Sequence, residues 1–166
     1  TYLADDQMLR NLSLWQMGTL AAGKPADVAL ALLTLAALLW LFMRDANPLN
    51  ALLLGEGEAR HLGVNVQSLK RRLILLTAAG VGVAVAVSGM IGFVGLVVPH
   101  LVRLLAGPNH VRLLPLSALL GAALLLAADM LARTLLAPAE LPVGIITALL
   151  GAPFFIWLLV KGRRAL

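Results

Sequence analysis

A single apolar run, residues 73–105, constrains the fold of this chain more than any other feature. One helix over the whole run would be about 50 Å long at 1.5 Å per residue, far longer than the roughly 30 Å hydrocarbon core of a bilayer. Within the run, Ser88 is followed by Gly89 and Gly92, which weaken a helix interior and permit a turn. The run therefore predicts two adjacent membrane-spanning helices, at 69–89 and, shorter, at 91–105.

The composition indicates that lipid, rather than water, surrounds most of the chain. Of the 166 residues 61% are hydrophobic and 13% are charged, and the mean hydropathy is +0.95. Soluble domains have about 45–50% apolar and about 25% charged residues, so an ordinary cytosolic enzyme, a disordered tail and a nucleic-acid-binding module are excluded. We expect an all-α, polytopic transmembrane bundle of about five spans, the two above and three more at 26–43, 113–136 and 142–160.

Basic residues flank the predicted spans and set their orientation. Lys and Arg gather in the loop 44–68 and just after it, in the loop 106–112 and in the tail 161–166. By the positive-inside rule these stretches are cytoplasmic, which leaves residues 1–25, with a short helix, and the turn 137–141 on the outer side. The rule also accounts for the formal net charge of +5 without a nucleic-acid partner.

Small residues recur along the spans, among them Gly80, Gly82, Gly144 and Gly151. Lipid supplies no hydrophobic drive between helices, so small residues are what allow spans to pack closely. We therefore expect a compact bundle rather than isolated membrane anchors.

The sequence carries no pattern that predicts catalysis or a metal site. It has no cysteine, which excludes thiol catalysis and Cys-ligated metals. The histidines His61, His100 and His110 lack metal-ligand spacing on one helix, and no nucleotide-binding loop or hydrolase motif occurs. We therefore expect the chain to bind no metal or cofactor and to hydrolyse no ATP by itself.

One pair of opposite charges lies inside a predicted span. Asp129 and Arg133 are four residues apart in the span 113–136. Ionisable residues within a span are candidates for function. At this spacing they also neutralise each other as an intrahelical ion pair, while the long Arg133 side chain reaches toward the membrane surface. We favour the ion pair.

The predicted cytoplasmic loop 44–68 contains two short helices. Asn47 is a good helix-capping residue and Pro48 suits a first helical position, so a short apolar helix begins there and ends at a glycine. A second helix follows at 56–62, with Gly63 as a left-handed cap. This charged segment with exposed leucines is either a docking site for a partner or an amphipathic loop on the membrane surface.

The stretch 89–103, GMIGFVGLVVPHLVR, resembles the signature of FecCD-like permeases of type II ABC importers, which import haem, iron chelates and cobalamin. The resemblance continues through residues 113–115, through Asp129 with Arg133, and through 140–155, ELPVGIITALLGAPFF. Residues 54–56 and 59–64 of the loop are similar to that family's contact with its ATPase. The match covers essentially the whole chain.

The resemblance implies a permease about twice this length, with about ten spans of about 20 residues each, of which this chain is the C-terminal half. It implies a permease homodimer in the bacterial inner membrane, two cytoplasmic ATPases that bind ATP-Mg, and a periplasmic substrate-binding protein. Closure of the ATPases would push on the short helices of the loop and drive alternating access. The ATPase contacts would come from Glu56, Glu58, Arg60, His61, Leu62 and Gly63.

Residues 2–10, followed by Trp15 and Gly18, resemble the haem-importing branch of the family. Haem carries two propionates, so Arg10 is a candidate to bind a carboxylate in the pathway, although Asp6 one turn earlier is an alternative partner. Tyr2 is a candidate to stack on the porphyrin or hydrogen-bond to it. We expect haem as the substrate, with ferric siderophore or cobalamin as alternatives. A non-transporting membrane scaffold subunit is the alternative from a different class.

Overall fold

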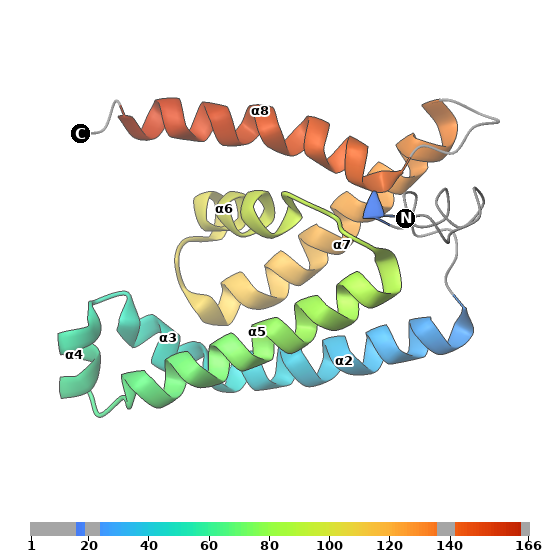
Figure 1. Cartoon of the computed structure of the whole chain (residues 1–166). Helices are drawn as coiled ribbons and strands as arrows, with labels where there is room; N and C mark the ends of the chain where they lie inside the picture. The colour runs from blue at the N-terminus through green and yellow to red at the C-terminus, as the bar shows by residue number, and fades with distance from the viewer. Residues whose placement is uncertain (1–15, 19–23, 136–141, 164–166) are drawn as a thin grey trace, which may run out of the picture. The chain divides into compact units, whose positions relative to one another are not determined.

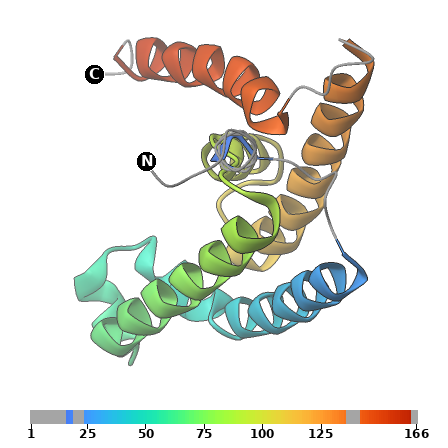
Figure 2. The same cartoon turned by 45° about the vertical axis from the view of Figure 1, so that its right-hand side comes forward.

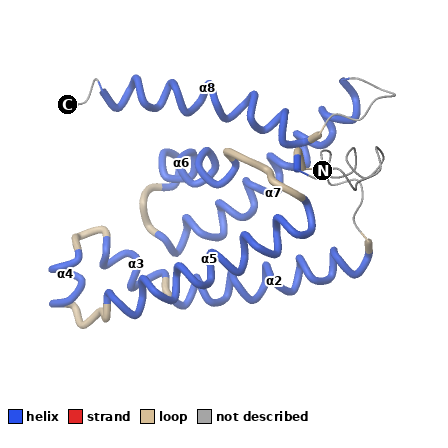
Figure 3. Tube along the Cα trace, in the orientation of Figure 1, coloured by secondary structure: helices blue, strands red, loops and turns tan. Residues whose placement is uncertain are grey.

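The computed structural model describes residues 16–18, 24–135 and 142–163, and within these ranges the regular elements are all helices (Figure 1, Figure 3). The predicted all-α fold is confirmed. The short helix predicted within 1–25 falls largely outside the described residues. The helices are α2 (Pro25–Arg44), α3 (Ala46–Leu52), α4 (Glu56–His61), α5 (Val66–Ser88), α6 (Val94–Ala106), α7 (His110–Leu135) and α8 (Val143–Arg163).

Three of these helices are long and apolar enough to cross a membrane: Pro25–Arg44, Val66–Ser88 and His110–Thr134. The chain is therefore a multi-pass membrane protein. By contrast, α6 has 13 residues, and at 1.5 Å per residue it is about 20 Å long, shorter than a hydrocarbon core of about 30 Å. The apolar part of α8, Val143–Leu158, is also shorter than a full span. Crossing of the membrane at these two helices stays a prediction.

A non-helical segment breaks the long apolar run where the sequence predicted it. The helix α5 ends at Ser88 and α6 begins at Val94, so α6 begins three residues later than the predicted span 91–105. Between the two helices, Phe93 has a φ of +66°, in the left-handed region that a bulky side chain rarely adopts. Its side chain packs against Gly151 of α8, where an added Cβ would have no room.

The chain divides into two compact units, which are described separately. The first, called the α2–α5 unit, comprises Lys24–Val87 and Pro99–Leu120. The second, called the α8 unit, comprises Thr1–Gly23, Ser88–Val98 and Gly121–Leu166. The helices α6 and α7 each contribute residues to both units.

In the α2–α5 unit, α3 and α4 form a compact turn that connects the end of α2 to the start of α5 (Figure 1, Figure 2). The first turn of α2 has a proline, Pro25, and is capped where the Lys24 N–H donates to the Asp27 carboxylate at 3.0 Å. Further along, α5 lies against α2 at Gly80, where an added Cβ would overlap the Leu38 side chain. Contact through a glycine is typical of helices that pack in lipid.

In the α8 unit, small residues bring α7 and α8 together. Ala128 and Ala132 of α7 form a buried cluster with Val143 and Ile146 of α8. Across the described residues no large side chain is fully buried, which fits a chain whose apolar faces meet lipid rather than a closed core.

The first turn of α8 is capped by backbone rather than by a side chain. The N–H groups of Val143 and Gly144 donate to the carbonyl oxygens of Gly18 and Met17 at 3.1 and 3.2 Å. Gly144 leaves no space for a Cβ, because the Met17 carbonyl occupies it. These bonds satisfy N–H groups that have no acceptor within the helix.

Candidate docking site on α3 and α4

The helix α3 begins at Ala46, earlier than predicted, because the chain turns at Asp45 rather than at Asn47. Asp45 occupies the N-cap position, and its carbonyl oxygen accepts the Leu49 N–H at 2.9 Å. Pro48 therefore lies in the first turn, where a missing N–H breaks no helical hydrogen bond. The predicted capping role of Asn47 is wrong.

The Asp45 carboxylate fixes the start of α3 to α5. Asp45 is only 2% exposed, and its Oδ1 accepts a hydrogen bond from the Arg72 guanidinium in an ion pair. The other carboxylate oxygen, Oδ2, has no hydrogen-bond partner among the described residues. A buried carboxylate is unfavourable unless it is paired, so the position of α3 depends on Arg72.

The helix α4 is delimited by two glycines with positive φ. Gly55, at φ +105°, is its N-cap, and Gly63, at φ +82°, follows its C-cap. The Gly63 N–H donates to the Arg60 carbonyl and the Val64 N–H to the Ala59 carbonyl, both at 2.9 Å. This pair of bonds is the Schellman motif, which requires a left-handed residue that glycine adopts without strain. The predicted left-handed cap at Gly63 is confirmed.

Glu56, at the start of α4, ties that helix to α5. Its Oε1 accepts a hydrogen bond from the Lys70 ammonium, and its Oε2 lies 3.6 Å from the Arg60 guanidinium one turn away. The Lys70 hydrogen bond and charge, and to a smaller extent the Arg60 charge, hold the pKa of Glu56 below its ordinary value. Glu56 therefore helps to fix α4 against α5, and because its side chain is also exposed, its predicted contact with a partner stays a prediction.

The exposed residues of α4 form a surface together with the turn before the helix and Leu62 after it, called the docking surface. It combines opposite charges with exposed leucines, of which Leu54 is 67% and Leu62 is 64% exposed. The structure thus brings the predicted contact residues together, with Glu56 and Gly63 setting the shape of the segment. Binding by this surface stays a prediction. Its exposed side chains are Leu53, Leu54, Glu56, Glu58, Arg60, His61 and Leu62.

Asn50, on α3, is a functional candidate that sequence reasoning missed. Its Oδ1 accepts the backbone N–H of His110 at 2.7 Å, and its Nδ2 donates to Asn109 Oδ1 at 3.0 Å. Both partners lie at the start of α7. The bonds join residues 59 and 60 positions apart in sequence, so no local pattern could have indicated them.

Two further pairs of site residues were predicted. The structure describes the ion pair within a span, and it does not describe the two residues predicted for the substrate pathway. Arg133 Nε donates to Asp129 Oδ2 at 2.8 Å within α7, so the predicted intrahelical ion pair is confirmed. Tyr2 and Arg10 lie outside the described residues. In the part of the chain that the structure describes, no group of three His, Cys, Asp or Glu side chains could hold a metal ion.

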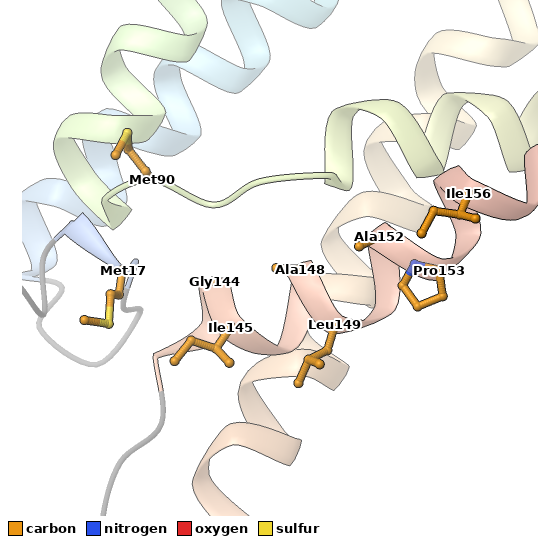
Figure 4. A pocket seen from close by; sticks show the side chains of 9 residues that line it. All are labelled: Met17, Met90, Gly144, Ile145, Ala148, Leu149, Ala152, Pro153 and Ile156. Carbon is orange, nitrogen blue, oxygen red and sulfur yellow. The ribbon is translucent and has the colours of Figure 1, made fainter. Parts of the chain in front are cut away.

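An open apolar pocket of about 600 Å³ lies along α8 in the α8 unit (Figure 4). Aliphatic and methionine side chains line it, and none of the lining side chains carries a charge, so it offers a hydrophobic surface without an anchor for a carboxylate. The lining residues are Met17, Met90, Gly144, Ile145, Ala148, Leu149, Ala152, Pro153 and Ile156.

These features define a multi-pass helical membrane protein with a helical segment fixed to the end of its bundle by polar contacts. The chain belongs to the FecCD transport family, whose sequence model matches residues 1–161. It is similar to the hemin transport system permease protein HmuU of Yersinia pestis, with 53% identity over 164 residues, 99% of this chain and 49% of that protein. It is also similar to the vitamin B12 import system permease protein BtuC of Vibrio cholerae serotype O1, with 48% identity over 162 residues, 98% of this chain and 49% of that protein.

A solved structure shows the same fold. An inward-facing metal-chelate type ABC transporter superposes with a TM-score of 0.87 at 38% identity, over 96% of this chain and 52% of that one. The chain therefore spans about half the length of the curated relatives and of the structural neighbour that it matches.

Proposed function

We propose that this chain acts within the permease subunit of an ATP-driven importer that carries haem across the bacterial inner membrane. The observation that carries this proposal is membership of the FecCD transport family together with 53% identity to a hemin transport permease. The permease works as a homodimer, a periplasmic protein delivers the substrate, and two cytoplasmic ATPases supply the energy. ATP-Mg binds to those ATPases, while this chain binds no cofactor and catalyses no reaction.

The docking surface is the contact for the ATPase. Exposed leucines flanked by Glu58 and Arg60 offer apolar area with a charged rim, which is the composition of a protein interface. Two ion pairs, Asp45 with Arg72 and Glu56 with Lys70, fix this segment to α5. A displacement of the segment by a closing ATPase therefore reaches the membrane helices instead of being absorbed by a flexible loop, and it drives alternating access.

Tyr2 and Arg10 are proposed to act at the outer end of the pathway. An arginine there binds a propionate of haem through charge-assisted hydrogen bonds, and a tyrosine ring stacks on the porphyrin face.

Cobalamin is the second candidate substrate. The observation that favours it is 48% identity over 162 residues to a vitamin B12 import permease. Ferric siderophore is a third, since the structural neighbour is a transporter of the metal-chelate type.

Uptake into proteoliposomes tests the proposal. The permease is reconstituted with its ATPase and binding protein and titrated with haemin, cobalamin and ferrichrome. We expect saturable, ATP-dependent uptake of haemin at the lowest concentration of the three. If uptake favours cobalamin or ferrichrome, that compound replaces haem as the proposed substrate. If none of the three is taken up in an ATP-dependent way, the non-transporting scaffold subunit remains as the alternative.

Charge reversal tests the docking surface in the same preparation. Glu58→Arg and Arg60→Glu are expected to uncouple ATP hydrolysis from transport, so that the loaded binding protein no longer stimulates the ATPase. Arg71→Glu, an exposed change on α5, is the control and should behave as wild type. Retained stimulation in both docking-surface variants would count against the assignment.

A further inference from the structure

The side chain of Asn50 joins α3 to the first turn of α7. Its Oδ1 lies 2.7 Å from the backbone nitrogen of His110 and 3.0 Å from the His110 ring nitrogen Nδ1. Its Nδ2 donates to Asn109 Oδ1 at 3.0 Å. One amide group thus contacts two consecutive residues at the start of α7.

The contact uses groups that a helix start leaves without partners. The first N–H groups of a helix have no acceptor within it, and they carry the positive end of the helix dipole. Asn109 Oδ1 accepts the Val111 N–H at 3.0 Å, as an N-cap side chain does, while Asn50 accepts the His110 N–H from another helix. The cap of α7 is therefore built jointly by α3 and by the residue that precedes α7.

This contact differs from the other two polar contacts of the segment. The ion pairs Asp45 with Arg72 and Glu56 with Lys70 both lead to α5. Asn50 leads to α7, and His110 is only 9% exposed. Partial exclusion of water makes such hydrogen bonds stronger and less mobile than exposed ones.

We propose that Asn50 is a positioning residue through which the start of α7 moves with α3 as one body when the docking surface is displaced. The proposal rests on the proposed function, because it assumes that an ATPase displaces that surface. It adds a second membrane helix, α7, to the path by which the displacement reaches the bundle.

A distance measurement tests the rigid link directly. Asn47→Cys on α3 and Val111→Cys on α7 place spin labels on exposed positions on either side of the contact, in a chain that has no cysteine. In the reconstituted complex, the distance distribution is expected to stay unchanged between the resting and the ATP-vanadate-trapped states. Adding Asn50→Leu, which removes the polar contacts with α7 and keeps the number of side-chain heavy atoms, is expected to broaden the resting distribution and shift it on trapping. A shift with Asn50 intact, or no effect of Asn50→Leu, would overturn the proposal.

Transport assays distinguish a positioning role of Asn50 from a purely structural one. Asn50→Leu is expected to lower haemin uptake per ATP hydrolysed by roughly fivefold, the effect of losing one or two hydrogen bonds, with the hydrolysis rate retained. Asn109→Asp keeps both acceptor interactions and should retain coupling. Asn47→Leu, exposed on the same helix, is the matched control. Uptake, hydrolysis and thermal stability falling in parallel in Asn50→Leu would show a structural role only and overturn the proposal.

Failure of the proposed function can be distinguished from failure of the proposal for Asn50. If wild-type protein shows no ATP-dependent uptake of haemin, cobalamin or ferrichrome, the proposed function fails. The resting distance distributions with and without Asn50→Leu still decide whether Asn50 holds α3 to α7.

Discussion

The α3–α4 segment and the helix α8 are held in place by different kinds of contact. The segment is fixed by side-chain polar groups: two ion pairs to α5 and the Asn50 amide on the start of α7. The helix α8 is fixed by backbone hydrogen bonds at its first turn and by shape: Gly144 sits against the Met17 carbonyl and Gly151 against the Phe93 side chain, with no room for a Cβ at either glycine.

The difference fits the two solvents predicted for these regions. At a membrane surface, water competes for polar groups, and a defined geometry needs paired charges and capped helix ends. In lipid, apolar burial does not favour one helix partner over another, so close backbone approach at small residues sets the packing. Substitutions that add atoms at the α8 contacts should therefore be destabilising. In the α3–α4 segment, substitutions that remove a polar partner should be destabilising.

The largest effect is expected from an added methyl group on α8. Gly151→Ala places a Cβ against Phe93 and should lower the free energy of unfolding by roughly 2–3 kcal/mol. Gly82→Ala on α5, where nothing lies within 4 Å, should raise it by up to about 1 kcal/mol through helix propensity. Denaturant titration of the purified permease in micelles measures both. A change in the free energy of unfolding with the same sign in both variants would contradict the claim that close packing at Gly151 fixes α8.

The next effect is expected from removing the partner of a buried charge. Arg72→Met leaves the Asp45 carboxylate buried and unpaired and should lower the free energy of unfolding by about 1–2 kcal/mol. Arg71→Met, next in sequence and exposed, should change it by less than about 0.5 kcal/mol. The same denaturant titration measures both variants. A loss of stability of equal size in Arg72→Met and Arg71→Met would contradict a specific role for Arg72.

A smaller effect is expected at the cap of α4. Gly63→Ala forces an alanine to a φ of +82° and should cost about 1 kcal/mol. Gly57→Ala, inside α4 with open space around it, should be neutral or stabilising. Limited proteolysis of the segment reports its local opening, and we expect faster cleavage only in Gly63→Ala.

The smallest effect concerns pH. Lys70 lowers the pKa of Glu56 from the ordinary 4.5, so the ionised carboxylate is favoured in the folded state. Its contribution to stability is present above pH 4.5 and is lost as the pH falls through the lower folded-state pKa. The wild type should therefore be slightly more stable than Glu56→Gln at pH 7, with the difference vanishing in acid. A difference that grows on acidification would contradict this sign.

The sequence was sufficient to predict what depends on local pattern. Apolar runs interrupted by glycine predicted the helices, and the charged loop with Gly63 predicted α4 with its left-handed cap. The start of α3 was misplaced because the chain turns at Asp45, whose buried carboxylate pairs with Arg72, distant in sequence. Phe93 takes its left-handed conformation with its side chain packed against Gly151, and Asn50 finds partners 59 and 60 residues away. Such tertiary contacts leave no local signal.

Cross-linking tests the central claim, that the docking surface contacts the ATPase, most directly. A photoreactive maleimide is attached at Leu54→Cys, on that surface, or at Leu33→Cys on α2, and the two positions are similarly exposed at 67% and 72%. The account predicts a permease–ATPase adduct from position 54 and none from position 33. No adduct from position 54, or equal adducts from both, would contradict it.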